Sequence, residues 1–286
     1  MNAIRKELLD RLRQIPDLPA SASELLRIIN YPEHDMHDIV NIIHCDPVMT
    51  SRILKVANCA AYSVSGAITT IDRAVALLGE SMLVGIVLAE ASSVLHRAEL
   101  PGYGAEPGDL WQHDLRTAIA ARNLARHATT PVEADLAFTC GLLHDLGKTL
   151  LSSALAEVFT EVKSALLVDS ADYLAIERDL LGITHPELGR ALAEKWRLPH
   201  PLPEAMALHH APAEAPANCR HLLYAVHLGD FTAMMAGFGT GVDTLRYRIE
   251  SAYPRYIAID QDALVQVMIQ VEDEFQALKE GFFSAD

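Results

Sequence analysis

Histidines and aspartates that could hold metal ions are concentrated in the second half of this 286-residue chain. Nine of the thirteen histidines follow residue 110. The residues that could do chemistry are His113, His144, Asp145, His185, His209, His210 and Asp230. Neutral imidazoles and carboxylates are both good ligands for Fe, Mn, Zn or Ni. The pattern therefore predicts a site for one or two divalent transition-metal ions.

The segment GLLHDLGK, residues 141–148, contains the most informative part of this pattern. If helical, the adjacent residues His144 and Asp145 diverge by about 100°, which suits one ion approached from a helix end, or two ions bridged by Asp145. Ions held there would generate a hydroxide nucleophile from bound water, so Asp145 is a candidate catalytic residue. Lys148 either neutralises a phosphate oxygen near the ions or is an ordinary solvated lysine, and it is the second candidate catalytic residue.

Other residues near this pattern have simpler interpretations. Asp109 precedes His113 by four residues, so it either faces the same side of a helix start or caps that helix. A single histidine on a helix is more often a surface or core residue than a ligand. That interpretation applies to His34, His37, His44, His127 and His221.

Composition and charge limit the function classes. The net charge is −15, and residues 106–286 hold 14 basic and 26 acidic side chains. This balance opposes binding to DNA through its phosphates and to an anionic membrane. The N-terminus lacks a signal-peptide pattern, and no stretch approaches about 18 uncharged apolar residues. We expect a soluble, cytoplasmic protein with four reduced, mostly buried cysteines.

The elements that must position these residues are predicted to be helices throughout. Apolar residues recur with a 3.6-residue period and no alternating strand pattern appears, so the fold class is all-α. A first helix is expected to stop before Pro16, and the fourth is expected to begin at Asp46-Pro47. Further helices are expected at about 21–30, 36–44, 71–78, 81–96, 109–127, 132–142, 149–168, 170–180, 185–196, 203–210, 219–235 and 262–278. Residues 100–109 contain three glycines and two prolines and are the expected boundary. The predicted parts are an N-terminal bundle, residues 1–100, and a metal-binding bundle, residues 109–286.

Several segments carry a resemblance to known families. GLLHDLGK, with LWQH upstream and LGD downstream, resembles the HD superfamily of metal-dependent phosphohydrolases. The stretches IPDLPASASELLRIIN, CDPVMTSRILKVANCAAYS and ITTIDRAVALLGESML resemble the HDOD family of bacterial signalling modules. The resemblance covers roughly residues 10–240. It implies a helical, cytoplasmic, bacterial protein that acts through contacts with other signalling proteins.

This chain keeps the metal residues that many HDOD proteins have lost. The order H…HD…H…HH…D is similar to the ligand order of HD-GYP phosphodiesterases, which implies the seven ligands given above and a phosphate-contacting role for Lys148. The segment HHAPAEAPANC lacks the GYP element, so cyclic di-GMP specificity is not implied. Two functions lead: a signalling protein with a structural or regulatory metal site, or an active phosphohydrolase acting on a nucleotide or another phosphoester. A helical scaffold that binds no metal is the third alternative.

Overall fold

The computed structural model describes residues 3–31, 33–62, 66–167 and 172–283. Over these residues the chain forms helices and loops, with two isolated β-bridges and no strand, which confirms the all-α prediction. The predicted helix boundaries that fall within 168–171 lie outside the described residues. Within the described part, no single helix combines the length and apolar character needed to cross a bilayer.

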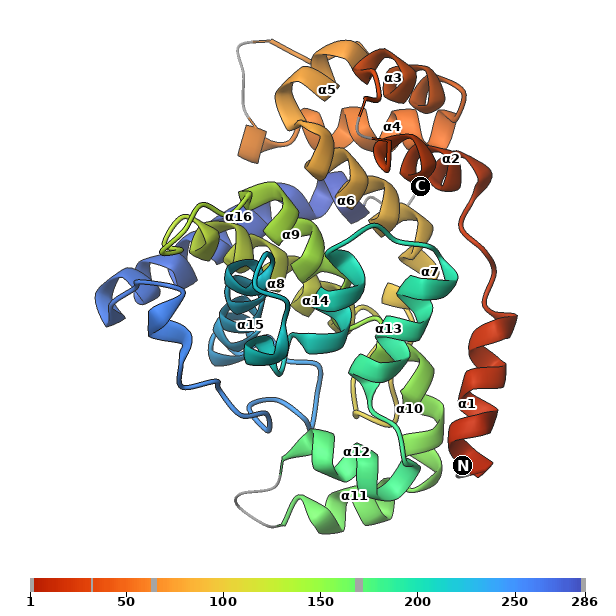
Figure 1. Ribbon diagram of the computed structural model, residues 1–286, viewed down its shortest axis with the longest axis vertical. Helices are drawn as coiled ribbons and strands as arrows, with labels where there is room; N and C mark the ends of the chain where they lie inside the picture. Colours follow the sequence, from red (N-terminus) through yellow and green to blue (C-terminus); the bar gives the residue numbers. More distant parts are fainter. Residues whose placement is uncertain (1–2, 32, 63–65, 168–171, 284–286) are drawn as a thin grey trace.

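The first half of the chain forms a bundle at the top of Figure 1. Asp46 begins one of its helices as the sequence predicts, because its carboxylate accepts hydrogen bonds from the backbone N–H groups of Val48 and Met49. The predicted helix 81–96 is broken at Ser92. The helices of this bundle are α2 (Ala20–Ile29), α3 (Met36–His44), α4 (Pro47–Ala57), α5 (Ile71–Leu78), α6 (Glu80–Ala91) and α7 (Ser93–His96), with the short η1 (Ala60–Tyr62).

The second half contains the helices that position the predicted ligands. The predicted helix 149–168 is divided at Val158 into two helices. In order, the helices are α8 (Asp109–Ala125), α9 (Ala134–Leu143), α10 (Gly147–Glu157), α11 (Phe159–Ala165), α12 (Tyr173–Leu181), α13 (His185–Lys195), α14 (Leu202–Leu208), η2 (Pro212–Glu214), α15 (Arg220–Met235), η3 (Tyr253–Arg255) and α16 (Gln261–Phe283).

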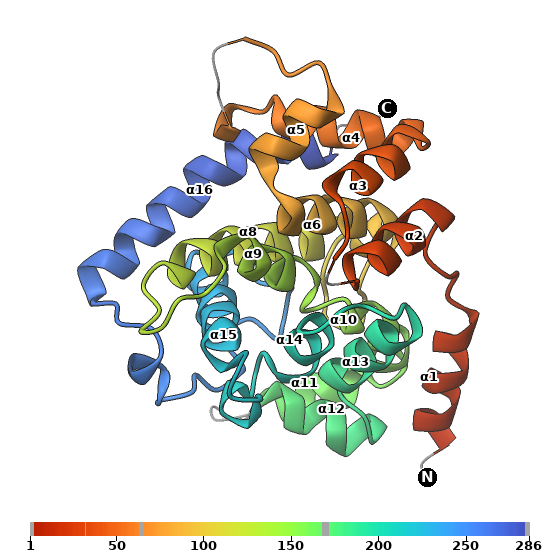
Figure 2. The same cartoon turned by 45° about the horizontal axis from the view of Figure 1, so that its top comes forward.

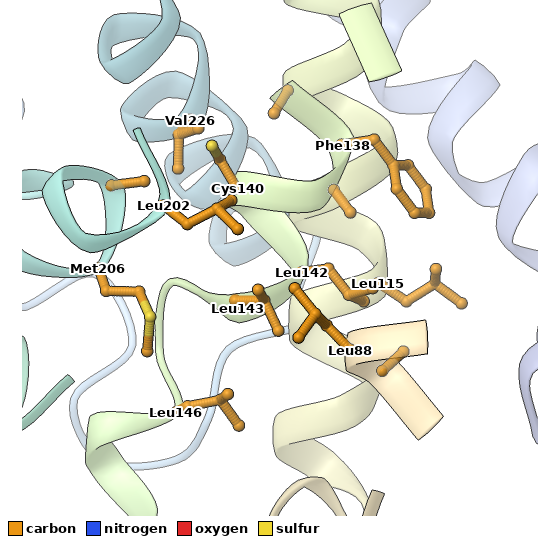
Figure 3. Packing of buried hydrophobic residues seen from close by; sticks show 14 of the residues in the cluster. Leu88, Leu115, Phe138, Cys140, Leu142, Leu143, Leu146, Leu202, Met206 and Val226 are labelled. Atoms are coloured by element: carbon orange, nitrogen blue, oxygen red, sulfur yellow. The ribbon is translucent and has the colours of Figure 1, made fainter. Parts of the chain in front are cut away.

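Helices α8, α9 and α15 pack closely at the centre of this half (Figure 2). A Cβ atom at Gly229 of α15 would lie 2.9 Å from the backbone oxygen of Thr117 in α8. This approach is therefore available only to glycine. Around it lies a hydrophobic core to which α6, α8, α9, α14 and α15 all contribute (Figure 3). The predicted site residues are thus carried by the most tightly packed elements of the protein.

The helix at each end of the chain packs against the opposite half. Helix α1 (Ala3–Gln14) packs beside α10 and α13 of the second half, and α16 returns to contact α4 of the first half (Figures 1 and 2). Buried hydrophobic residues from both halves form one continuous cluster. The division at residues 100–109 therefore stays a prediction, and the two parts share one core.

The glycine- and proline-rich segment 100–109 is packed rather than extended in solvent. Tyr103 is fully buried, and its hydroxyl donates to Glu177 at 2.7 Å. The backbone N–H of Gly102 donates to Ser152. The prediction of mostly buried cysteines is correct for Cys140 and Cys219, whereas Cys45 is exposed and Cys59 is half-buried.

Candidate metal centre

The carboxylate of Asp145 lies at the centre of the predicted ligand cluster. Asp145 sits in the turn between α9 and α10 and is 1% exposed. Its Oδ2 atom lies 3.6 Å from Nε2 of His113 and 3.4 Å from Nε2 of His144. Its Oδ1 atom lies 3.3 Å from Nε2 of His185 and 3.4 Å from Nε2 of His209. Each oxygen of one carboxylate therefore faces a separate pair of imidazoles, as a bridging ligand would.

Asp230 and His210 complete the two groups of predicted ligands around Asp145. Oδ1 of Asp230 lies 3.2 Å from Nε2 of His113 and 3.9 Å from Nε2 of His144. Oδ2 of Asp230 lies 3.7 Å from Nδ1 of His210. The structure thus brings all seven predicted ligands together, from α8, α13, α15 and the residues that follow α9 and α14.

Four of the histidines are oriented by hydrogen bonds at their Nδ1 atoms. Nδ1 of His113 lies 2.7 Å from the backbone oxygen of Phe238, and Nδ1 of His144 lies 2.7 Å from that of Gly141. Nδ1 of His209 faces two carbonyls of α14 at 3.2 Å, and Nδ1 of His185 lies 2.8 Å from Glu177. Carbonyls and carboxylates only accept, so each Nδ1 carries the proton. In a neutral ring, Nε2 then has the lone pair that binds a metal.

A close approach between two helices fixes the position of His185. A Cβ atom at Gly147 would lie 2.0 Å from the backbone oxygen of His185. Helix α13 itself begins at His185 with a capping box, in which Glu187 accepts from the backbone N–H of Thr184 at 2.9 Å. Gly147 of the GLLHDLGK segment is therefore required for the second imidazole pair, His185 and His209, to reach Asp145.

Several polar atoms in this cluster have no hydrogen-bond partner among the described residues. They include Nε2 of His144, Oδ1 of Asp145, Oδ2 of Asp230 and both ring nitrogens of His210. Leaving a buried polar atom unpaired costs about 1–3 kcal/mol. The unpaired atoms of His144, Asp145 and Asp230 lie within 3.9 Å of other predicted ligands, so the donor set fits one or two divalent cations. His113, His144 and Asp230 would hold one ion, His185, His209 and His210 the other, and Asp145 both.

The electrostatics show what replaces a cation in its absence. Burial opposes the charge of His144, but the neighbouring Asp145 carboxylate outweighs it and raises the pKa of His144 to about 9. Burial opposes the charge of His185 too, and Glu177 raises its pKa to about 9. Burial, together with the neighbouring His144 and His185, outweighs Asp145 and lowers the pKa of His209 to about 4. Protons therefore neutralise part of the carboxylate charge, and a metal ion must displace them.

Lys148, which the sequence predicts, lies in a second group of residues whose other members, Asp243 and Tyr247, were not predicted. Lys148 lies beside the ligands, and its Nζ atom is 2.7 Å from Oδ2 of Asp145 and 2.6 Å from Oδ2 of Asp243. The ring of Tyr247 stacks on His210 with centroids 4.0 Å apart. Asp243 and Tyr247 follow the GFGTG segment, whose glycines gave no indication of a functional role.

Two more supporting residues are buried histidine and aspartate side chains. Nδ1 of His227 lies 2.7 Å from the backbone oxygen of His209 and thereby supports that ligand. Asp114 lies on the far side of His144, 3.6 Å from its Nδ1, and 3.2 Å from Nε2 of His96. We assign Asp114 to the surroundings of the centre, because Nδ1 of His144 already donates to Gly141.

The remaining sequence candidates lie outside the centre. The carboxylate of Asp109 accepts from the backbone N–H of Glu106 at 2.8 Å, and the residue preceding the helix is Gly108. Asp109 is thus the first residue of α8 and not its cap. His221 is half-buried and lies 3.2 Å from the hydroxyl of Thr129, away from the predicted ligands.

Comparison with protein families gives an HDOD domain match over residues 15–212. The match runs through residues 100–109 and ends before Asp230. A curated, uncharacterized protein of Treponema pallidum (strain Nichols) is 28% identical over 224 residues, which make up 78% of this chain. The chain spans only 43% of the length of that relative.

Solved structures with the same architecture come from several bacteria. An HDOD domain protein of unknown function from Geobacter sulfurreducens has a TM-score of 0.71 at 20% identity, over 98% of this chain and 99% of that protein. A candidate phosphohydrolase from Shewanella amazonensis SB2B has a TM-score of 0.63 at 25% identity, over 96% of both chains. A candidate signal transduction protein from Marinobacter aquaeolei VT8 has a TM-score of 0.72 at 23% identity, over 96% of this chain and 60% of that protein.

Proposed function

The chain belongs to the HDOD family, and we propose that it is a signalling or regulatory HDOD protein that binds one or two divalent transition-metal ions. The observation that carries this proposal is the convergence of seven ligand-type side chains, with Asp145 at their centre and unpaired polar atoms among them. Unpaired buried carboxylates would be costly, and a divalent cation removes that cost. Other signalling proteins are the proposed partners.

A regulatory role is favoured over catalysis because the centre is closed. The predicted ligands and Lys148 are between 0% and 4% exposed. Lys148 donates to Asp145, Asp243 and Thr240, so its ammonium group has no free N–H for a substrate. Metal binding in such a site contributes its energy to folding. The ions would then stabilise one arrangement of the helices that partners recognise.

The experiment that tests this proposal is elemental analysis of protein purified without chelator. We expect one to two equivalents of a transition metal in the wild type, loss of metal in Asp145→Ala, and a reduced metal content in His185→Ala. Asp262→Ala, at an exposed position of α16, is the control and should keep the wild-type content. A metal content unchanged by Asp145→Ala would refute the proposed centre.

The second candidate function is a metal-dependent phosphohydrolase acting on a nucleotide or another phosphoester. It is supported by Lys148, whose ammonium lies 2.7 Å from Asp145, and by the likeness to the candidate phosphohydrolase of Shewanella amazonensis. A bound divalent ion would supply an activated water at such a site. Turnover of a phosphoester panel by the wild type, lost in Lys148→Ala with metal content intact, would establish this function.

A further inference from the structure

A short segment between α15 and η3 covers the ammonium group of Lys148. We call residues 239–244 the Lys148 cover. Its Thr240 hydroxyl lies 2.7 Å from Nζ of Lys148, and Oδ2 of its Asp243 lies 2.6 Å from the same atom. Asp145 takes the third N–H at 2.7 Å. An ammonium group has three donors, so the cover and the candidate bridging ligand fill them all.

The charge of the centre depends strongly on the metal. Asp114, Asp145, Glu177, Asp230 and Asp243 bring five negative charges and Lys148 brings one positive charge, a balance of −4 with neutral histidines. The protons on His144 and His185 leave the metal-free centre at −2, whereas two divalent ions on neutral histidines bring the balance to 0. A negative centre repels anions, so metal loading favours the exchange of the Asp243 carboxylate for an external oxyanion.

Backbone hydrogen bonds attach the cover to its surroundings. The N–H of Val242 donates to the carbonyl oxygen of Tyr103 at 2.8 Å, and the carbonyl oxygen of Asp243 accepts from the N–H of Arg246 at 2.9 Å. Gly241 has a φ of +131°, and a Cβ atom there would lie 2.1 Å from that same carbonyl. The neighbouring residue Leu245 is 52% exposed. Close contact at Gly241 thus holds the cover against the protein.

We propose that Asp243 is an internal substitute for a phosphate group on Lys148, and that the cover excludes phosphate-type oxyanions until they displace it. This inference rests on the proposed metal centre. In the closed state Asp243 neutralises Lys148 and is itself held by the hydroxyls of Thr240 and Tyr247. A phosphate offers Lys148 the same charge-assisted hydrogen bonds, so the two anions compete for one position.

The test is calorimetric titration of inorganic phosphate into metal-loaded protein, with metal content measured on the same samples. Asp243→Asn keeps the shape of the side chain and removes the competing charge. We expect phosphate to bind this variant at least about 10-fold more tightly than the wild type, a difference of about 1.4 kcal/mol. Asp262→Asn changes the net charge equally at an exposed site and should bind phosphate like the wild type.

Gly241→Ala provides an independent variant. Its Cβ atom forces the cover away from Tyr103, while the Asp243 side chain itself is not substituted. It should also bind phosphate more tightly, and the gain in Asp243→Asn should vanish when Lys148→Met is added. Hydrogen exchange of residues 239–244 should accelerate when phosphate is added to the loaded wild type. Equal phosphate affinity in the wild type and Asp243→Asn, with metal retained, would overturn the cover. Absence of metal from the wild type would instead refute the proposed centre, and the cover with it.

Discussion

Glu177 is the residue that most directly controls one half of the metal centre. It is fully buried, and it accepts hydrogen bonds from Nδ1 and the backbone N–H of His185 and from the hydroxyl of Tyr103. A carboxylate behind a ligating imidazole fixes the tautomer and makes the other nitrogen more basic. The Nδ1 atom of His185 thus donates to a carboxylate, whereas the Nδ1 atoms of His113, His144 and His209 face backbone carbonyls.

Replacing Glu177 by Gln should weaken metal binding by about 10- to 100-fold, because the charge behind His185 is lost while the side-chain shape is kept. Competition with a chromophoric chelator measures this change. Glu187→Gln is the matched control, since it alters the capping box of the same helix and contacts no ligand. Equal metal affinity in both variants would show that Glu177 has only a structural role.

The titration of the histidines predicts how pH acts on the metal-free protein. The pKa values of His144 and His185 are raised to about 9, against about 6.5 in an unfolded chain. Their stabilising contribution is complete below about pH 6.5 and is lost as the pH rises through 9. His209, with its pKa lowered to about 4, stabilises above about pH 6.5 and loses this effect as the pH falls.

We therefore expect the Tm of the metal-free protein to be highest near pH 6.5 and to fall towards pH 9. Metal ions require neutral imidazoles, so they bind more tightly as the pH rises over the same range. The difference in Tm between metal-loaded and chelator-treated protein should consequently increase from pH 6.5 to pH 9 in thermal scans. A difference that shrinks with pH would contradict this assignment of protons to the centre.

At the residue scale, the sequence predicts the ligands better than their supports. His144-Asp145 and His209-His210 stand out as pairs of ligand-type residues, and the structure brings them together as expected. Glu177 and Asp243 look like any other acidic residue, because only the fold places them beside His185 and Lys148. The carbonyl of Phe238, which orients His113, is a backbone atom that no residue type could indicate.

Arg116 of α8 joins helix α16 to the surroundings of the metal centre. The guanidinium carbon of Arg116 lies 3.4 Å from the ring centroids of both Phe238 and Phe275. Its Nε atom is 2.9 Å from Glu272. Phe275 and Glu272 belong to α16, whereas the carbonyl of Phe238 accepts from the ligand His113. Arg116 therefore holds α16 and the residue that orients His113 against the same surface of α8.

Substituting Arg116 by Ala should lower the free energy of unfolding by about 2–3 kcal/mol, since desolvated cation–π contacts contribute about 2 kcal/mol and the stacked side chain also packs. Urea unfolding measures the loss. Arg190→Ala, which removes an exposed ion pair with Glu194, should change stability by less than about 0.5–1 kcal/mol. Equal losses of unfolding free energy in the two variants would show that the contacts of Arg116 with Phe238 and Phe275 add nothing beyond an exposed ion pair.

At the scale of elements, helices were predicted well where capping residues are clear and poorly where the apolar pattern continues. Asp46-Pro47 marks the start of α4 correctly. The breaks at Ser92 and Val158 were missed, because the residues on both sides keep helical spacing and no glycine or proline intervenes. Tertiary packing decides such breaks, and it also fixes the turn around the buried Tyr103 within the predicted boundary segment 100–109.

For the whole molecule, the arrangement of the chain ends bears on how it unfolds. Helix α1 packs on the second half, and α16 packs on the first. Nη1 of Arg52 in α4 donates to the backbone oxygen of Gly281 in α16, and Nε pairs with Glu90 of α6. A buried cluster of apolar side chains continues from one half to the other. Each predicted part, 1–100 and 109–286, thus has a terminal helix that packs on the other part. The cytoplasmic location and the absence of DNA binding stay predictions.

We expect the metal-loaded protein to unfold as one cooperative unit. Separating the two predicted parts would expose the apolar side chains that α6 buries against α9 and that α16 buries against α4, and exposing such surface costs about 25 cal/mol per Å². Calorimetry should therefore give one transition with equal calorimetric and van't Hoff enthalpies. Hydrogen exchange should show α4, α6, α8 and α15 losing protection at the same denaturant concentration. Two transitions, or loss of protection in residues 1–100 alone, would establish two independent domains and make the packed segment at 100–109 their boundary.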